Sequence, residues 1–138
     1  MSSHAQKEEY LVTVPRVSPV EFRQIGREVR CDPGGFLLER GDEPYRFAYG
    51  APNELSVLKI SKKSLAEKVR DPDRFCARII DARSGLSALF TAMMQQLHSL
   101  PIGEGRAAEV LGRQMVEVLA LALDATAGDD QQVRTSVR

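Results

Sequence analysis

The chain has 138 residues, of which 43% are hydrophobic and 28% are charged. This length suffices for one modest hydrophobic core and is too short for two ordinary domains. Lysine and arginine together number 19, as do aspartate and glutamate, and the resulting net charge of zero argues against nonspecific binding to nucleic acid or to a membrane surface.

Membrane insertion, secretion and disulfide bonding are also disfavoured. The most apolar stretch, residues 116–123, is far shorter than the roughly 20 residues of a membrane-spanning helix. Residues 1–9 contain no apolar secretory core, so we expect a disordered start and a cytoplasmic protein. Cys31 and Cys76 have neither metal-ligand spacing nor a CxxC pair, and we interpret them as reduced, buried apolar fillers.

The first half of the chain predicts β-strands. A β-rich run at 10–14 is followed by alternating segments at 20–25 and 28–31, which flank a turn at Gly26-Arg27. Turns rich in Gly, Pro and Asp then separate further strands, which we predict at 36–40, 45–49 and 54–60. Strands at intervals of about eight to twelve residues are typical of an antiparallel barrel or sandwich.

The second half predicts helices. A short helix begins at Ser61 or Ser64, and residues 73–81 fit either a strand or a helical turn. Apolar residues at helical spacing predict one helix over 84–100 and a second from about Glu104 to Ala125. The fold class is therefore α+β, with an antiparallel pair of amphipathic helices after the sheet. We expect one domain over residues 10–126 and a polar tail or linker over 127–138.

The last turns of the second helix are apolar almost all round, so both sides of this helix need a cover. One interpretation is a second copy of the chain in a symmetric dimer, and the other is the preceding helix of the same subunit. Both interpretations stay open. If a dimer forms, its interface would include Leu111, Met115, Val118, Leu119 and Ala122.

A ligand site, if there is one, is expected as an apolar cavity in the strand half with a few polar groups. Phe36, Leu38, Tyr45 and Phe47 are the candidates to line it. Alternating aromatic residues also pack ordinary cores, and that interpretation remains for all four.

Four short segments resemble the cupin-like ligand-binding domain of AraC-type transcription regulators. They are Gly26-Arg27-Glu28, Asp32-Pro33-Gly34-Gly35-Phe36, Glu43-Pro44-Tyr45 and Leu58-Lys59-Ile60-Ser61. The resemblance runs from about Tyr10 to Ala125. The chain departs from the family pattern at Gly35, where the family turn usually has Asp, and at Ser61-Lys62, where it usually has Pro-Arg.

The resemblance implies a partial cupin-like barrel or sandwich that senses an effector and dimerises through the C-terminal helices. The family's preceding strands and its following helix-turn-helix module are not found in this sequence, so we expect no direct nucleic-acid contact by this chain. A stand-alone interaction protein that pairs with related regulators, or a small-molecule-binding cupin, are the alternatives.

Catalysis is not expected. A cupin metal site needs several histidines and a carboxylate, and the only histidines are His4 and His98, neither of them on a predicted strand. We therefore predict no metal, no cofactor and no enzymatic activity, and we interpret His98 as a helix-surface or dimer-rim residue.

Overall fold

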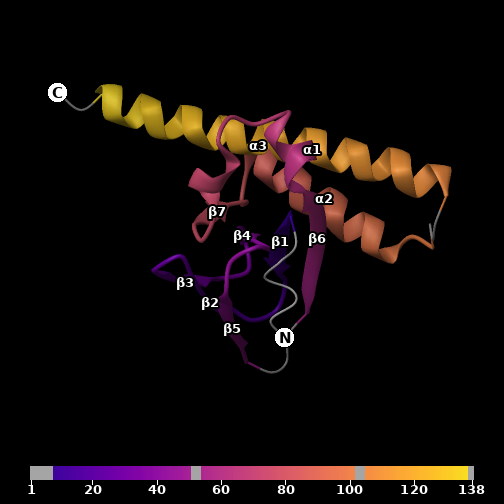
Figure 1. The fold of residues 1–138 in the computed structure, drawn as a ribbon, viewed down its shortest axis with the longest axis horizontal. Coiled ribbons are helices and arrows are strands. Elements are labelled where there is room, and N and C mark those ends of the chain that lie inside the picture. The colour runs from indigo at the N-terminus through magenta and orange to yellow at the C-terminus, as the bar shows by residue number, and fades with distance from the viewer. Residues whose placement is uncertain (1–7, 51–53, 102–104, 137–138) are drawn as a thin grey trace.

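The computed structural model describes residues 8–50, 54–101 and 105–136, and describes side chains as far as residue 128. Within these ranges, seven strands form two antiparallel sheets, and helices pack on the outer face of the larger sheet (Figure 1). The order of elements agrees with the predicted α+β class, with strands first and a helix pair after them. The sheets form a sandwich.

The larger sheet has the strand order β6-β1-β4-β7. Its members are β1 (Glu9–Pro15), β4 (Gly35–Arg40), β6 (Leu55–Ser61) and β7 (Ile79–Asp81). The central strands β1 and β4 are almost completely buried, because one face meets the helices and the other meets the smaller sheet. A strand covered on both faces has a continuous apolar run, as in Phe36-Leu37-Leu38.

The smaller sheet has the order β3-β2-β5 and consists of β2 (Val20–Gln24), β3 (Arg27–Cys31) and β5 (Tyr45–Tyr49). Strand β2 alternates buried and exposed residues, as expected when only one face is covered. The β2–β3 turn is centred on Ile25 and Gly26, one residue earlier than predicted. Both have positive φ, at 56° and 70°, as a two-residue type I′ hairpin turn requires.

The described residues also form four helical segments: α1 (Lys62–Ala66), the 3-10 helix η2 (Pro72–Phe75), α2 (Gly85–Ser99) and α3 (Arg106–Ser136). Ser61 is the N-cap of α1, since its side chain accepts a hydrogen bond from the Ser64 amide at 3.1 Å. Residues 73–81, which the sequence left between strand and helix, supply part of η2 and all of β7. Figure 1 shows α3 as the longest element, lying along the side of the molecule opposite the smaller sheet.

Two hydrophobic cores follow from this layering. The larger lies between the outer face of the larger sheet and the helices, where Phe36 meets Phe90 of α2 with ring centroids 5.2 Å apart. The smaller lies between the sheets and is formed by Val20, Phe22, Cys31, Leu37 and Ala77. Neighbouring residues of β4 thus belong to different cores.

The chain ends differ from the sequence-based expectation. Helix α3 extends to Ser136, about eleven residues past the predicted end near Ala125, so most of the predicted tail over 127–138 is helical backbone. Glu9 is the first residue of β1 and so is not part of a disordered start. Residues 1–7, including His4, lie outside the described ranges. No helix in the described part of the chain is both long enough and apolar enough to cross a membrane.

Candidate ligand site between the sheets

The strand registers define which residues face the space between the two sheets. Leu37 belongs to the inter-sheet core and pairs with Thr13 of β1, which pairs in turn with Val57 of β6. Directly paired residues share a face, so this row of three lies on the inner face of the larger sheet. Two residues along each strand, Glu39, Leu11 and Lys59 form the next row on that face.

Strand β5 presents a row of aromatic residues to the same space. Tyr45, Phe47 and Tyr49 pair with Gln24, Phe22 and Val20 of β2, whose side chains are buried between the sheets. The rings contact one another in sequence, since Phe47 lies 5.8 Å from Tyr49 and 6.1 Å from Phe22 between centroids. Tyr45 is nevertheless 46% exposed and Tyr49 59% exposed. The inner face of β5 is therefore open at this edge of the sandwich.

The inner face also holds a buried acid. Glu39 is only 4% exposed, and within the described residues its carboxyl group has no hydrogen-bond or ion-pair partner. Burial raises the pKa of Glu39 to about 7, because the charged form loses its hydration without gaining a partner. Near neutral pH this carboxyl is therefore a mixture of the protonated and ionised forms.

The peptide that carries Glu39 is held on both sides. Towards the smaller sheet, the Gln24 side chain accepts a hydrogen bond from the Arg40 amide at 3.0 Å and donates one to the Arg40 carbonyl at 2.7 Å. Gln24 thus continues the hydrogen bonding of β4 beyond the end of β7 and joins the two sheets. With the backbone fixed in this way, Glu39 is kept on the inner face.

The side chain of Arg40 anchors the same peptide from the helix side. Its guanidinium donates to both carboxylate oxygens of Asp42, at 3.1 and 3.3 Å, and lies 3.6 Å from Asp73. Lys62 donates to Asp42 at 2.7 Å, and the Tyr10 hydroxyl donates to Asp73 at 2.5 Å. Burial alone would raise the pKa of Asp42, but the hydrogen bonds from Arg40 and Lys62 outweigh it and lower the pKa. This network ties β1, β4, α1 and η2 together.

The structure separates the four predicted lining residues into two pairs. Tyr45 and Phe47 face the space between the sheets, as a ligand-lining role requires. Phe36 and Leu38 are fully buried in the other core, against the helices, and so do not line this space. For Phe36 and Leu38 the core interpretation is the one that the structure supports.

Glu39 was missed by the sequence-based reasoning. The available signal was an ionisable residue that directly follows a run of three apolar residues in a strand. Alternation places it on the same face as Leu37, which makes it an inward-facing acid.

The predicted interface residues of α3 also divide. Met115, Leu119 and Ala122 are at most 1% exposed in a single chain, and Met115 and Leu119 belong to the core between the larger sheet and the helices, so none of the three lies on the surface of this subunit. Leu111 and Val118 are half-buried. Leucines that are open to solvent lie elsewhere on the helix pair: Leu86 and Leu89 of α2 and Leu121 of α3, at 37%, 50% and 54% exposure.

Cys31 and Cys76 are buried, whereas His98 lies on a helix surface. Burial raises the pKa of the Cys31 thiol to about 11 and that of Cys76 to about 12. His98 is exposed on α2, where its Nδ1 lies 2.9 Å from the Met94 carbonyl oxygen of the preceding turn. Among the described residues, no group of three or more His, Cys, Asp or Glu side chains could hold a metal ion.

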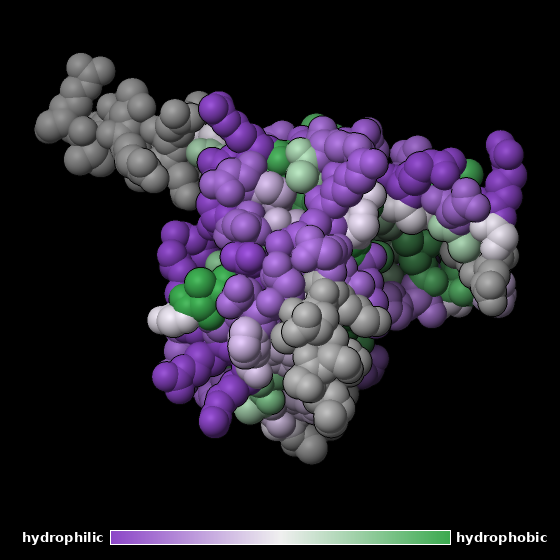
Figure 2. Space-filling model, viewed as in Figure 1, coloured by the Kyte–Doolittle hydropathy of each residue, from purple (hydrophilic) through white to green (hydrophobic). Residues whose placement is uncertain are grey.

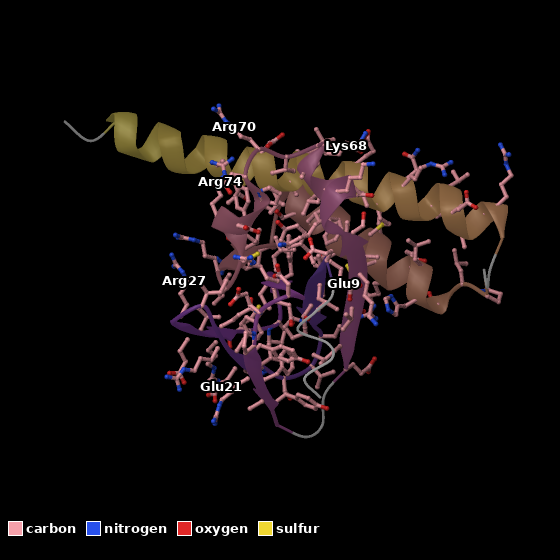
Figure 3. All side chains as sticks on the ribbon, viewed as in Figure 1. Glu9, Glu21, Arg27, Lys68, Arg70 and Arg74 are labelled. Atoms are coloured by element: carbon pink, nitrogen blue, oxygen red, sulfur yellow. The ribbon has the colours of Figure 1, made fainter. Side chains whose placement is uncertain are left out.

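An open groove of about 520 Å³ lies on the outer face of the smaller sheet. Arg23 is paired with Glu28 on one side and with Arg46 on the other, so the groove carries both signs of charge. In Figure 3, Glu21 and Arg27 extend from this sheet into solvent. Mixed charges on an exposed strand face are typical of a solvated surface.

Comparison with known proteins agrees with this architecture. The model of the AraC-binding-like domain matches residues 1–124. The crystal structure of the AraC-like transcriptional activator CuxR superposes with a TM-score of 0.68 at 16% sequence identity, covering 89% of this chain and 45% of that one. This chain therefore spans less than half of that activator's length. No curated protein matches the sequence.

Proposed function

The chain belongs to the AraC-binding-like domain family, and from that premise we propose that it is the effector-sensing and dimerisation domain of an AraC-type transcription regulator. The observation that carries the proposal is the extent of the family match. Residues 1–124 include the space between the sheets and most of the helix pair, so the match covers both parts that a sensor domain needs. The zero net charge supports a role other than direct contact with DNA.

Strand β4 is the element that we propose as the link between sensing and association. Its inner face presents Leu37 and Glu39 to the space between the sheets, and its outer face presents Phe36 and Leu38 to the helices. The Phe36 ring contacts the Phe90 ring of α2 at an interplanar angle of 51°, so a ligand that moved β4 would also move the helix pair. A ligand that favours one position of β4 would then favour one arrangement of the helices.

We propose a binding role and no catalytic one. A nucleophilic cysteine needs an accessible thiolate, whereas Cys31 and Cys76 are buried and their raised pKa values keep both thiols protonated.

Association is assigned to the outward surface of the helix pair. Figure 2 shows apolar side chains in the hollow between α2 and α3, towards the end where the two helices are joined. Leu89 and Leu121 are each at least half exposed on these helices. Apolar side chains exposed on packed helices would be covered in a symmetric dimer.

The solution mass tests this assignment. We expect light scattering of the full chain at about 50 µM to give twice the 15.3 kDa of one chain. The double variant Leu89→Lys, Leu121→Lys should be a folded monomer with an unchanged circular dichroism spectrum. Val17→Lys is the matched control, since Val17 is 48% exposed in the β1–β2 connection and should leave the dimer intact. A wild-type monomer at this concentration would overturn the proposed dimerisation.

A further inference from the structure

The buried carboxyl of Glu39 is energetically unfavourable as it stands. A buried ionisable group normally has a partner, because desolvation of an unpaired charge costs several kcal/mol. Glu39 has none among the described residues, although Gln24 and Arg40 hold its backbone in place from both sides. A fixed, unpartnered acid in a space whose β5 wall is partly exposed is suited to a partner that enters from outside the chain.

The charges around Glu39 determine the sign of that partner. Leu11 lies directly opposite on β1, and Glu9, half-buried, is on the same face of β1 one step further. Lys59 of β6 is exposed and lies beyond Leu11, two strands and roughly 10 Å from Glu39. On β2, Gln24 is occupied by the Arg40 backbone. Arg27 of β3 pairs with Gln24 and so belongs to the same face, but it is exposed and extends into solvent (Figure 3). Both cations at this end, Lys59 and Arg27, are thus solvated, and neither forms an ion pair with Glu39. The ionised Glu39 carboxylate therefore has no compensating positive charge beside it among the described residues.

The aromatic residues of β5 provide the second half of a cation site. Tyr45 pairs with Gln24, which places Tyr45 at the Glu39 end of the sandwich, and Phe47 and Tyr49 continue the row. Tyr45 and Tyr49 are exposed and Phe47 is half-buried, so part of this aromatic row is accessible from solvent. Aromatic faces attract cations through the ring quadrupole and also pack against apolar groups.

We propose, building on the sensor function proposed above, that the space between the sheets binds a small organic cation, a protonated amine on an apolar or aromatic body, with Glu39 as counter-ion and the aromatic row of β5 as the wall. The ammonium group would donate hydrogen bonds to the Glu39 carboxylate. The apolar body would cover the exposed ring of Tyr45 and the half-buried ring of Phe47.

Binding is then coupled to a proton. Glu39 must lose its proton before it can pair with the cation, and its pKa of about 7 makes this loss incomplete at neutral pH. With that pKa, the dissociation constant of an amine that stays charged should fall about tenfold between pH 6 and pH 8. Replacing Glu39 by glutamine should abolish this dependence.

The experiment measures the thermal unfolding midpoint of the full chain with three probes of one shape: benzylamine, benzyl alcohol and benzoate. We expect benzylamine at tenfold its dissociation constant to raise the midpoint by about 5 °C at pH 8, and by less at pH 6. The alcohol and the carboxylate should have little effect. Glu39→Gln should lose the response to benzylamine, whereas Lys59→Gln, which removes a like charge near the entrance, should enhance it.

The outcomes separate this inference from the function on which it rests. Equal responses of wild type and Glu39→Gln to benzylamine would overturn the cation site. A response to benzoate or benzyl alcohol alone would also overturn it, while leaving effector sensing intact. If no probe binds, the cation site is refuted, and the sensor proposal is then judged by the solution mass. Glu39→Gln is nearly isosteric, and its own unfolding midpoint shows whether it folds.

Discussion

Replacing Glu39 by glutamine should raise the free energy of unfolding. This gain should appear only above about pH 4.5, where the carboxyl group begins to ionise in the unfolded chain. The pKa of this carboxyl rises from 4.5 to about 7 on folding, because the side chain is buried without a partner. Each unit of pKa difference corresponds to about 1.4 kcal/mol, so the full difference amounts to about 3 kcal/mol. The folded state retains the proton more strongly than the unfolded state, and ionisation therefore favours unfolding.

The sign of the effect fixes the pH window. Below pH 4.5 the carboxyl is protonated in both states and costs nothing. As the pH rises towards 7, the unfolded chain loses its proton first, and the stability of the wild type falls relative to the variant. Above the folded-state pKa the difference is constant. The free energy of unfolding of the variant, relative to that of the wild type, should therefore increase by about 3 kcal/mol between pH 4.5 and a pH above 7.

Urea unfolding at pH 4.5, 6 and 8, followed by circular dichroism, measures this difference. Glu21→Gln is the matched control, since Glu21 is exposed on the outer face of the smaller sheet and should show no such trend. The comparison of each variant with the wild type at the same pH removes the contributions of all other titrating groups. A stability difference for Glu39→Gln that does not change with pH would refute the reasoning.

Three further substitutions or reactions test the packing. Tyr10→Phe removes the hydrogen bond to Asp73 and should cost about 2 kcal/mol in urea unfolding, because the acceptor is charged. Leu119→Asp should abolish folding, as judged by a lost unfolding transition, since Leu119 is completely buried; a folded monomer would contradict the observed packing. Cys31 and Cys76 should resist a thiol reagent at pH 7.5 until urea unfolds the chain, because both are buried with raised pKa values; rapid labelling of native protein would disprove it.

The spacing of turns and apolar residues was sufficient to predict the element order, because turn residues and helical periodicity are local properties. Turn chemistry placed the strand ends within a residue or two, as at Gly26, where only the exact centre was missed. The length of α3 was not predicted, because the residues after Ala125 lose the apolar stripe while remaining compatible with a helix.

The faces of β4 could not be assigned from the sequence. Phe36-Leu37-Leu38 is apolar throughout, and a strand buried on both sides has no alternation to show which residue faces which layer. In β5 the alternation is clear, and Tyr45 and Phe47 were placed on the inner face correctly. Glu39 follows the ambiguous run, so its direction depended on the same unresolved choice.

The apolar turns of α3 are a second case in which the sequence alone could not settle the packing. Their all-round hydrophobicity predicted a cover on both sides of the helix, but it could not show which cover applies to which side. In the structure, Met115 and Leu119 join the core above the larger sheet, while Lys68, just after α1, forms an ion pair with Glu117 at 2.6 Å on another side of α3. One subunit thus buries Met115 and Leu119 by itself, whereas Leu121 stays exposed on the same helix.

Strand β4 is buried on both faces, with Glu39 on the inner face and Phe36 and Leu38 on the face towards the helices. A ligand that pairs with Glu39 would remove the cost of its buried charge, and would stabilise whichever position of β4 brings the carboxyl group to the ligand. Phe36 and Leu38 move with that strand, and they contact the same core as Phe90 and Leu119 of the helix pair. Because such a core is close-packed, a small shift of β4 must be accommodated by the helices. If the chain senses an effector and dimerises as proposed, β4 is the most direct link between the two, because this single layer separates the space between the sheets from the helices.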